Sequence, residues 1–228
     1  MENGVKGKIG FRYRETIDRP AQDLLKALGA LAAANLSDGM NKFYTMDCGI
    51  RRMFPCPRMF GPAVTVKVRA GDNMMLHKAI ELVSPGDILV VETQGCNAYA
   101  VMGELMVSSM AGMGVAGIVV DGTVRDLGDL EKIGVPVFAR GTVCGAGDKD
   151  GPGEINFPIS CGGVVVQPGD VVVGDGDGVV VVPAADIEIV LENARKKVAY
   201  EEKRKEEIKS GIFVKPGLDE ILRQKNVF

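Results

Sequence analysis

The feature that most constrains the fold is an alternation of short β-branched runs with helical segments between residues 63 and 139. Residues 63–69 read AVTVKVR, and their alternating pattern predicts a half-buried strand. Further strands are expected at 88–91, 117–120 and 135–139, with helices at 73–83 and 99–113. Strands and helices at this interval indicate βαβ units with partly parallel pairing, so we expect an α/β fold.

The segments on either side of this region have a different character. Leucines at helical spacing predict a helix over residues 19–35. Three valine runs at 164–166, 171–173 and 179–182 are separated by PGD and GDGDG turns, which predicts an antiparallel β-meander. A long helix at 184–209 follows, and its second half is so rich in Lys, Arg and Glu that we expect it to be solvated. A short segment at 218–223 ends the chain.

Length and charge limit the class of protein. With 228 residues, 46% of them apolar and 25% charged, the chain is expected to form a single domain over 1–228. Residues 1–20 would be an N-terminal extension and residues 184–228 a C-terminal helical extension. The formal net charge is −3 without a strongly basic stripe, which argues against a nucleic-acid partner.

The same considerations predict a soluble, cytoplasmic protein without a membrane partner. The N-terminus is charged and has no apolar run of the kind found in signal peptides. The longest uncharged stretch, 105–120, has 16 residues, fewer than the roughly 20 that a membrane span needs. The five cysteines are scattered and never spaced as C-x-x-C, so we expect them to be reduced and mostly buried.

The residues best suited to chemistry lie between Gly103 and Asp126. Gly103 precedes an apolar helical stretch and would let a ligand approach backbone N–H groups. Arg125 and Asp126 follow a predicted strand, where α/β sheets bind ligands. The arginine can hold a carboxylate in a forked hydrogen bond, and the aspartate can bind a hard cation. The alternative is a surface salt bridge in which Asp126 caps a helical turn at 127–131.

Several short motifs, weak one by one, are specific together. They are GDN at 71–73, HKA at 77–79, PGD at 85–87, GEL at 103–105, DGTVRD at 121–126 and CGGVVVQPGD at 161–170. From about residue 36 to the long C-terminal helix, the chain resembles the family of class II pyruvate aldolases (4-hydroxy-4-methyl-2-oxoglutarate and 4-carboxy-4-hydroxy-2-oxoadipate aldolases). That family also contains the regulator of ribonuclease E activity A.

The resemblance implies a fold and an assembly. The fold would be a swivelling β/β/α domain like the phosphohistidine domain, with mixed sheets, flanking helices and a long C-terminal helix. The assembly would be a homotrimeric ring, often paired into a hexamer, with active sites between subunits.

The resemblance also implies roles for individual residues. Asp126 would hold Mg²⁺ or Mn²⁺, and Arg125 would bind the keto and carboxylate oxygens of the substrate. Backbone groups of Gly103, Glu104, Leu105 and Met106 would bind the pyruvyl carboxylate. The Glu104 side chain would position or deprotonate a water that shuttles the proton. The family's best-studied members have an aspartate at this position, which is one methylene shorter.

Two other positions have both a structural and a functional interpretation. His77 either packs its predicted helix or, as the family implies, contacts the substrate or a water of the metal. In this family the charged C-terminal helix can reach a neighbouring subunit, so Glu201 or Glu202 would complete a site in trans.

The resemblance implies two alternative functions, and two lysines suggest a third. The first is a metal-dependent lyase that cleaves 4-hydroxy-2-oxo acids of the 4-hydroxy-4-methyl-2-oxoglutarate type to pyruvate and a second 2-oxo acid, and that also decarboxylates oxaloacetate. The second is a non-enzymatic ring protein that binds a ribonuclease, a branch that lacks the acid present here as Glu104. The third is a Schiff-base aldolase that uses Lys67 or Lys78.

Overall fold

The computed structural model describes residues 4–227. Its helices are α1 (Gln22–Gly29), α2 (Ala33–Gly39), α3 (Met74–Ala79), α4 (Glu104–Gly112), α5 (Leu127–Ile133), α6 (Ile187–Lys209) and α7 (Leu218–Gln224). Its strands are β1 (Val5–Lys8), β2 (Phe11–Arg14), β3 (Arg51–Arg52), β4 (Met59–Val68), β5 (Ile88–Glu92), β6 (Ala100–Met102), β7 (Gly117–Val124), β8 (Val137–Thr142), β9 (Gly153–Ile155), β10 (Ile159–Cys161), β11 (Val164–Val166), β12 (Val171–Asp175) and β13 (Gly178–Val182). Within residues 4–227, no helix is both long and apolar enough to span a membrane.

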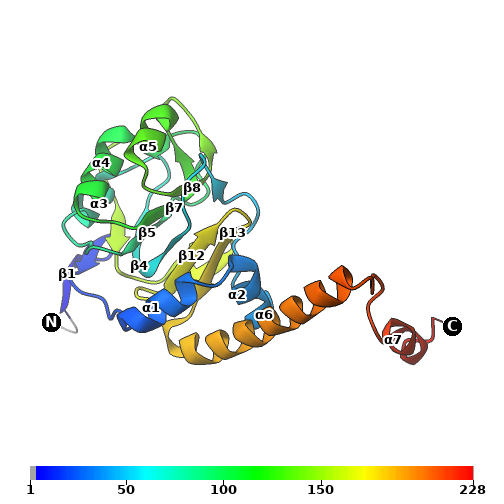
Figure 1. Cartoon of the computed structure of the whole chain (residues 1–228). Coiled ribbons are helices and arrows are strands. Elements are labelled where there is room, and N and C mark those ends of the chain that lie inside the picture. Colours follow the sequence, from blue (N-terminus) through cyan, green and yellow to red (C-terminus); the bar gives the residue numbers. More distant parts are fainter. Residues whose placement is uncertain (1–3, 228) are drawn as a thin grey trace.

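The centre of the molecule is a mixed sheet with the strand order β1-β2-β9-β4-β5-β7-β8-β3. Strands β4, β5, β7 and β8 run parallel, as the βαβ pattern predicts. Helices α3, α4 and α5 cover one face of this sheet (Figure 1). The carboxyl ends of the parallel strands therefore meet at one edge, close to the start of α4 and α5.

The ten-residue strand β4 joins two layers. Its first residues, 59–62, pair with β12, whereas residues 63–67 pair with β5. The hairpin β12–β13 thus packs under the main sheet, and α1, α2 and α6 cover its outer face (Figure 1). The result is the mixed α/β fold of stacked sheets and flanking helices that the sequence predicts.

The expected β-meander is only partly correct. β12 and β13 form an antiparallel hairpin, but β11 pairs with β10 in a separate two-stranded sheet. Gly162 and Gly163 both have positive φ, which favours a tight turn between β10 and β11. The other edge of β12 is occupied by β4, so no edge is left for β11.

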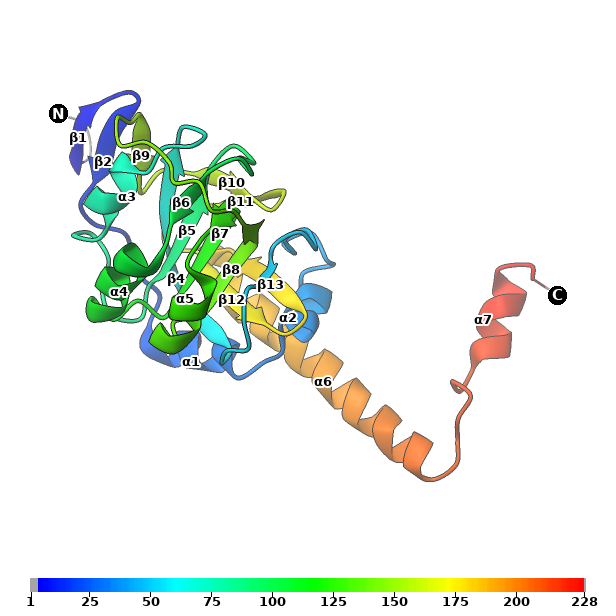
Figure 2. The same ribbon diagram turned by 90° about the horizontal axis from the view of Figure 1, so that it is seen from above.

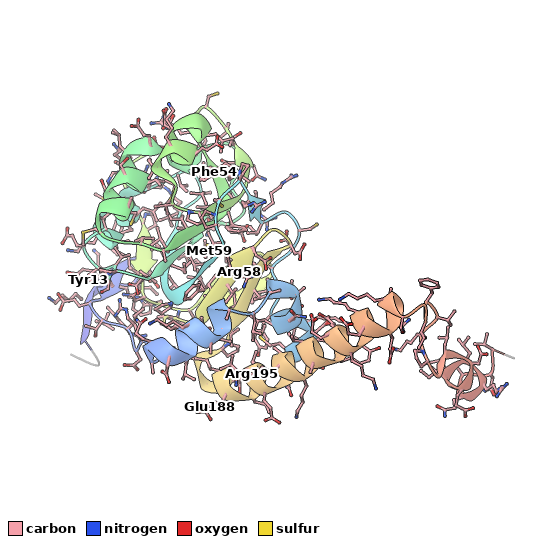
Figure 3. All side chains as sticks on the ribbon, in the orientation of Figure 1. Tyr13, Phe54, Arg58, Met59, Glu188 and Arg195 are labelled. Atoms are coloured by element: carbon pink, nitrogen blue, oxygen red, sulfur yellow. The ribbon has the colours of Figure 1, made fainter. Side chains whose placement is uncertain are left out.

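The single helix expected at 19–35 is two helices, α1 and α2. Arg58 donates hydrogen bonds to the carbonyl oxygens of Gly29 and Leu31, at 2.9 and 3.0 Å, and so ends α1. Asp175 accepts a hydrogen bond from the Ala33 N–H at 2.9 Å and so starts α2. Figure 3 shows Arg58 and Met59 in the body of the protein, where β4 begins.

Other expectations also need correction. Residues 100–102, expected to be helical, form strand β6 beside β7, and α3 is shorter than the helix expected at 73–83.

All five cysteines are free, but only Cys161 is buried, and its burial raises the pKa of the thiol. Cys48 and Cys144 lie in surface turns and are exposed, so the expectation that most cysteines are buried is wrong.

The C-terminal helix α6 has two parts. Its first turns bury Ile187, Val190 and Leu191 and contact α2. Its second half and α7 extend away from the body (Figures 1 and 2). Ion pairs such as Lys205–Glu202 and Lys209–Glu206 line this second half, as expected for a solvated helix.

Candidate active site

A cavity of about 180 Å³ opens at the carboxyl edge of the parallel strands. Its walls come from α3, from the junction of β6 and α4, from the residues between β7 and α5, and from the loop 143–152 that follows β8. The lining residues are Asn73, His77, Ala100, Met102, Gly103, Leu105, Met106, Arg125, Asp126, Ala146, Gly147 and Lys149. Most of the residues proposed from the sequence therefore lie in one place.

Asp126 has an unusual conformation and an unexpected partner. Its φ of 61° lies in the left-handed region, which is uncommon for residues other than glycine. Its Oδ2 accepts a hydrogen bond from the backbone N–H of Glu104 at 3.0 Å and lies 3.5 Å from Arg125 Nε. The side chain makes no capping hydrogen bond to α5. The alternative interpretation is thus only partly correct: Asp126 forms the salt bridge with Arg125 and is the N-cap residue of α5, but its side chain does not cap the helix.

Gly103 allows this close approach between α4 and the end of β7. A Cβ atom at this position would lie 2.2 Å from Asp126 Oδ2 and 2.9 Å from Arg125 Cγ. Both distances are too short for any side chain. The sequence indicated a glycine at a ligand site, and the structure shows that the glycine makes room for Asp126 and Arg125.

The first turn of α4 faces the cavity. The N–H groups of Leu105 and Met106 have no acceptor within the helix, because the first turn of any α-helix lacks one. Together with the positive end of the helix dipole, they form a favourable environment for a carboxylate. Leu105 and Met106 both line the cavity, as the resemblance implies for the residues that bind the pyruvyl carboxylate.

Glu104 contacts the site through its backbone N–H, which donates to Asp126. Its side chain is exposed, and Glu104 is not among the described residues that line the cavity. The pKa of Lys132 on α5 is raised chiefly by its hydrogen bond to Asp129 and to a smaller extent by the charge of Glu104. The Glu104 carboxylate is therefore close enough to the α5 side to influence Lys132, and its role in proton transfer stays a prediction.

His77 and Lys149 form another part of the wall. His77 lines the cavity from α3 and is exposed to solvent, and the desolvation of its ring by the wall, followed by the charge of Lys149, lowers the pKa of its imidazole. The imidazole is therefore neutral at pH 7. Lys149 was not proposed from the sequence. The rule that ligands bind after parallel strands would have found it, because the loop 143–152 follows β8.

The donor set fits a hard divalent cation. Asp126 Oδ2 is engaged by the Glu104 N–H, and Oδ1 accepts no hydrogen bond from residues 4–227. In that part of the chain, no three His, Cys, Asp or Glu side chains come together as a metal site. Mg²⁺ often binds through one or two carboxylates and keeps several waters, so a single aspartate suits it.

The other candidates lie elsewhere in the chain. Lys67 pairs with Glu92 at 2.9 Å and Lys78 with Glu81 at 2.6 Å, and neither lines the cavity. Glu201 accepts a hydrogen bond from Asn35 at 2.9 Å, and Glu202 pairs with Lys205 on α6. The proposed contribution of Glu201 or Glu202 to a neighbouring subunit stays a prediction.

The fold and the cavity define an α/β protein with a cavity at the carboxyl edge of its sheet, lined by Arg125, Asp126, Lys149 and the start of α4. The family model "RraA-like: Aldolase/RraA" matches residues 33–181. The chain therefore belongs to the RraA-like family.

Individual relatives are consistent with this assignment. The chain is 37% identical over 191 residues to a Halalkalibacterium halodurans protein named "Putative 4-hydroxy-4-methyl-2-oxoglutarate aldolase", covering 84% of this chain and 91% of that protein. The crystal structure of Streptomyces coelicolor RraAS2, described as an unusual member of the RNase ES inhibitor RraA protein family, has a TM-score of 0.77 at 29% identity. It covers 83% of this chain and 99% of its own. The crystal structure of an uncharacterized protein from Pseudomonas syringae has a TM-score of 0.76 at 29% identity. The match covers 86% of this chain and 96% of that chain.

Proposed function

We propose that this protein is a divalent-metal-dependent carbon–carbon lyase. Its substrates would be 4-hydroxy-2-oxo acids of the 4-hydroxy-4-methyl-2-oxoglutarate type, cleaved to pyruvate and a second 2-oxo acid. The observation that carries the proposal is the contact of Asp126 with the start of α4, beside Arg125 and in the wall of one cavity. Relatives named as aldolases of this type support it.

The residues divide the binding of a 2-oxo acid between them. The N–H groups of Leu105 and Met106 would hold the carboxylate at the start of α4. Arg125 would donate a forked hydrogen bond to the keto oxygen and the neighbouring carboxylate oxygen. Asp126 would hold Mg²⁺ or Mn²⁺ through Oδ1, and the bound ion would supply positive charge for the keto oxygen and lower the pKa of water.

Cleavage follows from this arrangement. A base takes the proton of the 4-hydroxyl group, the C4–O bond becomes a carbonyl, and the electrons of the C3–C4 bond move toward the keto oxygen. Arg125 stabilises the negative charge that develops there. A proton then adds to C3 and pyruvate leaves. Loss of carbon dioxide from oxaloacetate places the same charge on the same oxygen, so we expect decarboxylation in the same site.

The base that takes the proton of the 4-hydroxyl group is a separate question. Asp126 is the only carboxylate among the described residues of the cavity wall, and it is assigned to the metal. We infer that the base acts through a water and is Glu104, or a glutamate of a neighbouring subunit in a homotrimer or homohexamer. The second half of α6, which projects from the body, carries Glu201 and Glu202 (Figure 2).

Pyruvate release from oxaloacetate tests the proposal. We expect turnover with Mg²⁺ or Mn²⁺, loss of turnover with EDTA, and recovery when the metal is restored. Asp126→Ala should abolish turnover and keep the circular dichroism spectrum of the wild type. No metal-dependent release from oxaloacetate or 4-hydroxy-4-methyl-2-oxoglutarate would contradict the proposal.

A second function is favoured by a different observation. The fold closely matches a structure from the RNase ES inhibitor RraA protein family, and Glu104, the expected catalytic residue, is exposed and is not among the described residues that line the cavity. This second function is a non-enzymatic ring protein that binds a ribonuclease. It would be supported if this protein lacked lyase activity and inhibited RNA cleavage by a purified ribonuclease E.

A further inference from the structure

We infer that a second cavity of the protein binds an organic carboxylate with an apolar body, and that its occupation changes the surroundings of His77 in the candidate active site. This cavity is a groove of about 380 Å³ between the N-terminal hairpin, the end of β4 and strand β9. None of its lining residues also lines the candidate active site. The groove is therefore a separate site, and the inference does not depend on the proposed function.

The N-terminal hairpin builds one wall of the groove. Strands β1 and β2 are joined by the turn at Ile9 and Gly10, and β2 pairs with β9. The Gly10 N–H donates to Glu154 Oε1 at 2.9 Å, and the Gly153 N–H donates to the Gly10 carbonyl at 2.7 Å. Figure 2 shows β1, β2 and β9 next to one another, at the end of the molecule away from α7. This wall lies before residue 33, where the match to the family model begins.

The rim of the groove is apolar. Ile9 occupies the turn of the hairpin and is 81% exposed, although turns of this kind are usually made of glycine, asparagine or aspartate. Val68, Pro152 and Pro158 add apolar surface to the same wall. An apolar ring or chain in the groove would cover these side chains and remove them from water, which favours binding.

The charged groups of the groove are three cations and one carboxylate, namely Arg12, Lys67, Arg69 and Glu154. Arg12 donates to Glu154 at 3.0 Å, so these two charges neutralise each other. Lys67 contacts Glu92, which lies outside the groove wall, at 2.9 Å. Arg69 has no comparable ion pair, and the groove therefore has an excess of positive charge at the end of β4.

Arg69 has hydrogen-bond donors to spare. Within residues 4–227, its side chain makes one hydrogen bond, to Asp72 Oδ2 at the long distance of 3.4 Å. That oxygen already accepts hydrogen bonds from the N–H groups of Asp150 at 2.9 Å and Gly151 at 3.0 Å. The Arg69 side chain is about half exposed, so its guanidinium group can turn to a ligand. A guanidinium group binds a carboxylate through two parallel hydrogen bonds.

Asp72 connects the groove to the candidate active site. Its carboxylate is fully buried and also accepts a hydrogen bond from the N–H of Met74, the first residue of α3, at 2.9 Å. Helix α3 carries His77 into the wall of the active-site cavity. A ligand that draws Arg69 away from Asp72 therefore acts on the carboxylate that holds the start of α3. We expect such a ligand to change the environment of the His77 ring.

Fluorescence anisotropy of naphthalene-2-carboxylate tests the site. We expect wild-type protein to bind this probe with a Kd at or below about 1 mM and to bind it more weakly at high salt. Naphthalene-2-carboxamide has the same ring without the charge and should bind about tenfold more weakly. Arg69→Met should raise the Kd of the carboxylate about tenfold, since a charge-assisted hydrogen bond is lost. Arg125→Met is the matched control, because it removes a cation from the other cavity, and it should leave the Kd within about twofold.

A further variant distinguishes a lost ligand contact from a damaged fold. Glu154→Gln removes the one carboxylate of the groove wall and keeps an oxygen that accepts the Gly10 N–H. It should lower the Kd of naphthalene-2-carboxylate severalfold, a change that a damaged fold does not produce. Absence of binding to the wild type, an equal Kd for wild type and Arg69→Met, or a rise in Arg125→Met as large as in Arg69→Met would overturn the site.

The imidazole signal of His77 in nuclear magnetic resonance spectra tests the connection. Naphthalene-2-carboxylate should shift this signal in the wild type, and the same concentration should shift it much less in Arg69→Met. Binding that leaves the His77 signal unchanged would overturn the connection to the active site. None of these measurements uses turnover, so absence of metal-dependent pyruvate release would overturn the proposed function alone.

Discussion

The carboxylate of Asp126 and the backbone N–H of Glu104 are hydrogen-bonded at 3.0 Å, although 22 residues separate them in the chain. This bond joins the end of β7 to the first turn of α4. The proposed metal ligand and the proposed carboxylate-binding N–H groups therefore form one unit. A displacement of one of them moves the other, so small changes at this contact should have large effects on turnover.

Gly103→Ala tests this coupling. The added Cβ would lie 2.2 Å from Asp126 Oδ2, so the aspartate or the start of α4 must shift. A displacement of about 1 Å in a catalytic site costs about 100-fold in rate. We expect a loss of kcat/KM of that order with a higher metal requirement, measured by pyruvate release against Mg²⁺ concentration.

Gly112→Ala is the matched control on the same helix. No atom lies within 4 Å of a Cβ at this position, so activity should be unchanged. Alanine is favoured over glycine inside a helix by up to about 1 kcal/mol, so the melting temperature should stay the same or rise slightly. Full activity of Gly103→Ala would show that Asp126 tolerates displacement and would contradict the proposed coupling.

The sequence was sufficient for the parts of the fold that depend on local patterns. The β-branched runs located β4, β5, β7 and β8, and the order of the chain placed Arg125 and Asp126 at the end of β7. The division of 19–35 into two helices depends on Arg58 and Asp175, which are distant in sequence and leave no local signal. Such breaks cannot be read from helical spacing alone.

The site shows the same distinction. The resemblance implied that Glu104, Arg125 and Asp126 share one site, but not that the aspartate binds the Glu104 backbone while Glu104 is absent from the described lining of the cavity. Lys149 was missed because the rule that ligands bind after parallel strands was applied to the end of β7 and not to the loop 143–152 after β8. Its position depends on the buried carboxylate of Asp72.

Arg125→Lys should lose most of the activity. Lysine keeps the positive charge but cannot donate the two parallel hydrogen bonds of a guanidinium group to the keto and carboxylate oxygens. We expect kcat to fall about 100-fold, because a donor to the developing charge is lost. Steady-state kinetics with oxaloacetate measures this, and a variant with wild-type kcat would remove Arg125 from the proposed mechanism.

Glu104→Gln separates the side chain of this residue from its backbone. The N–H that binds Asp126 is retained, so pyruvate should inhibit the variant as strongly as the wild type. If the carboxylate moves the proton through a water, kcat should fall about 100-fold. An unchanged kcat would exclude Glu104 as the base and direct attention to Glu201→Gln and Glu202→Gln. Mixing each of these with an Asp126→Ala protein would then show whether activity is restored across subunits.

His77 offers a direct measurement of the cavity's electrostatics, because it is the only histidine in the chain. Desolvation of the ring, and then the charge of Lys149, lowers the pKa of its imidazole below the ordinary value of 6.5. Nuclear magnetic resonance titration of untagged protein should give one imidazole signal with a midpoint below 6.5. In Lys149→Met the midpoint should move up toward 6.5 but not reach it, since the desolvation of the ring remains.

The same pKa shift predicts how stability depends on pH. Because the pKa of His77 is lower in the folded protein, the neutral ring contributes stability that is fully present above about pH 6.5 and is lost as the pH falls through the folded pKa. His77→Gln should therefore weaken the fall in melting temperature below pH 6.5. A wild-type midpoint at or above 6.5 would contradict the placement of His77 beside Lys149 in the cavity wall.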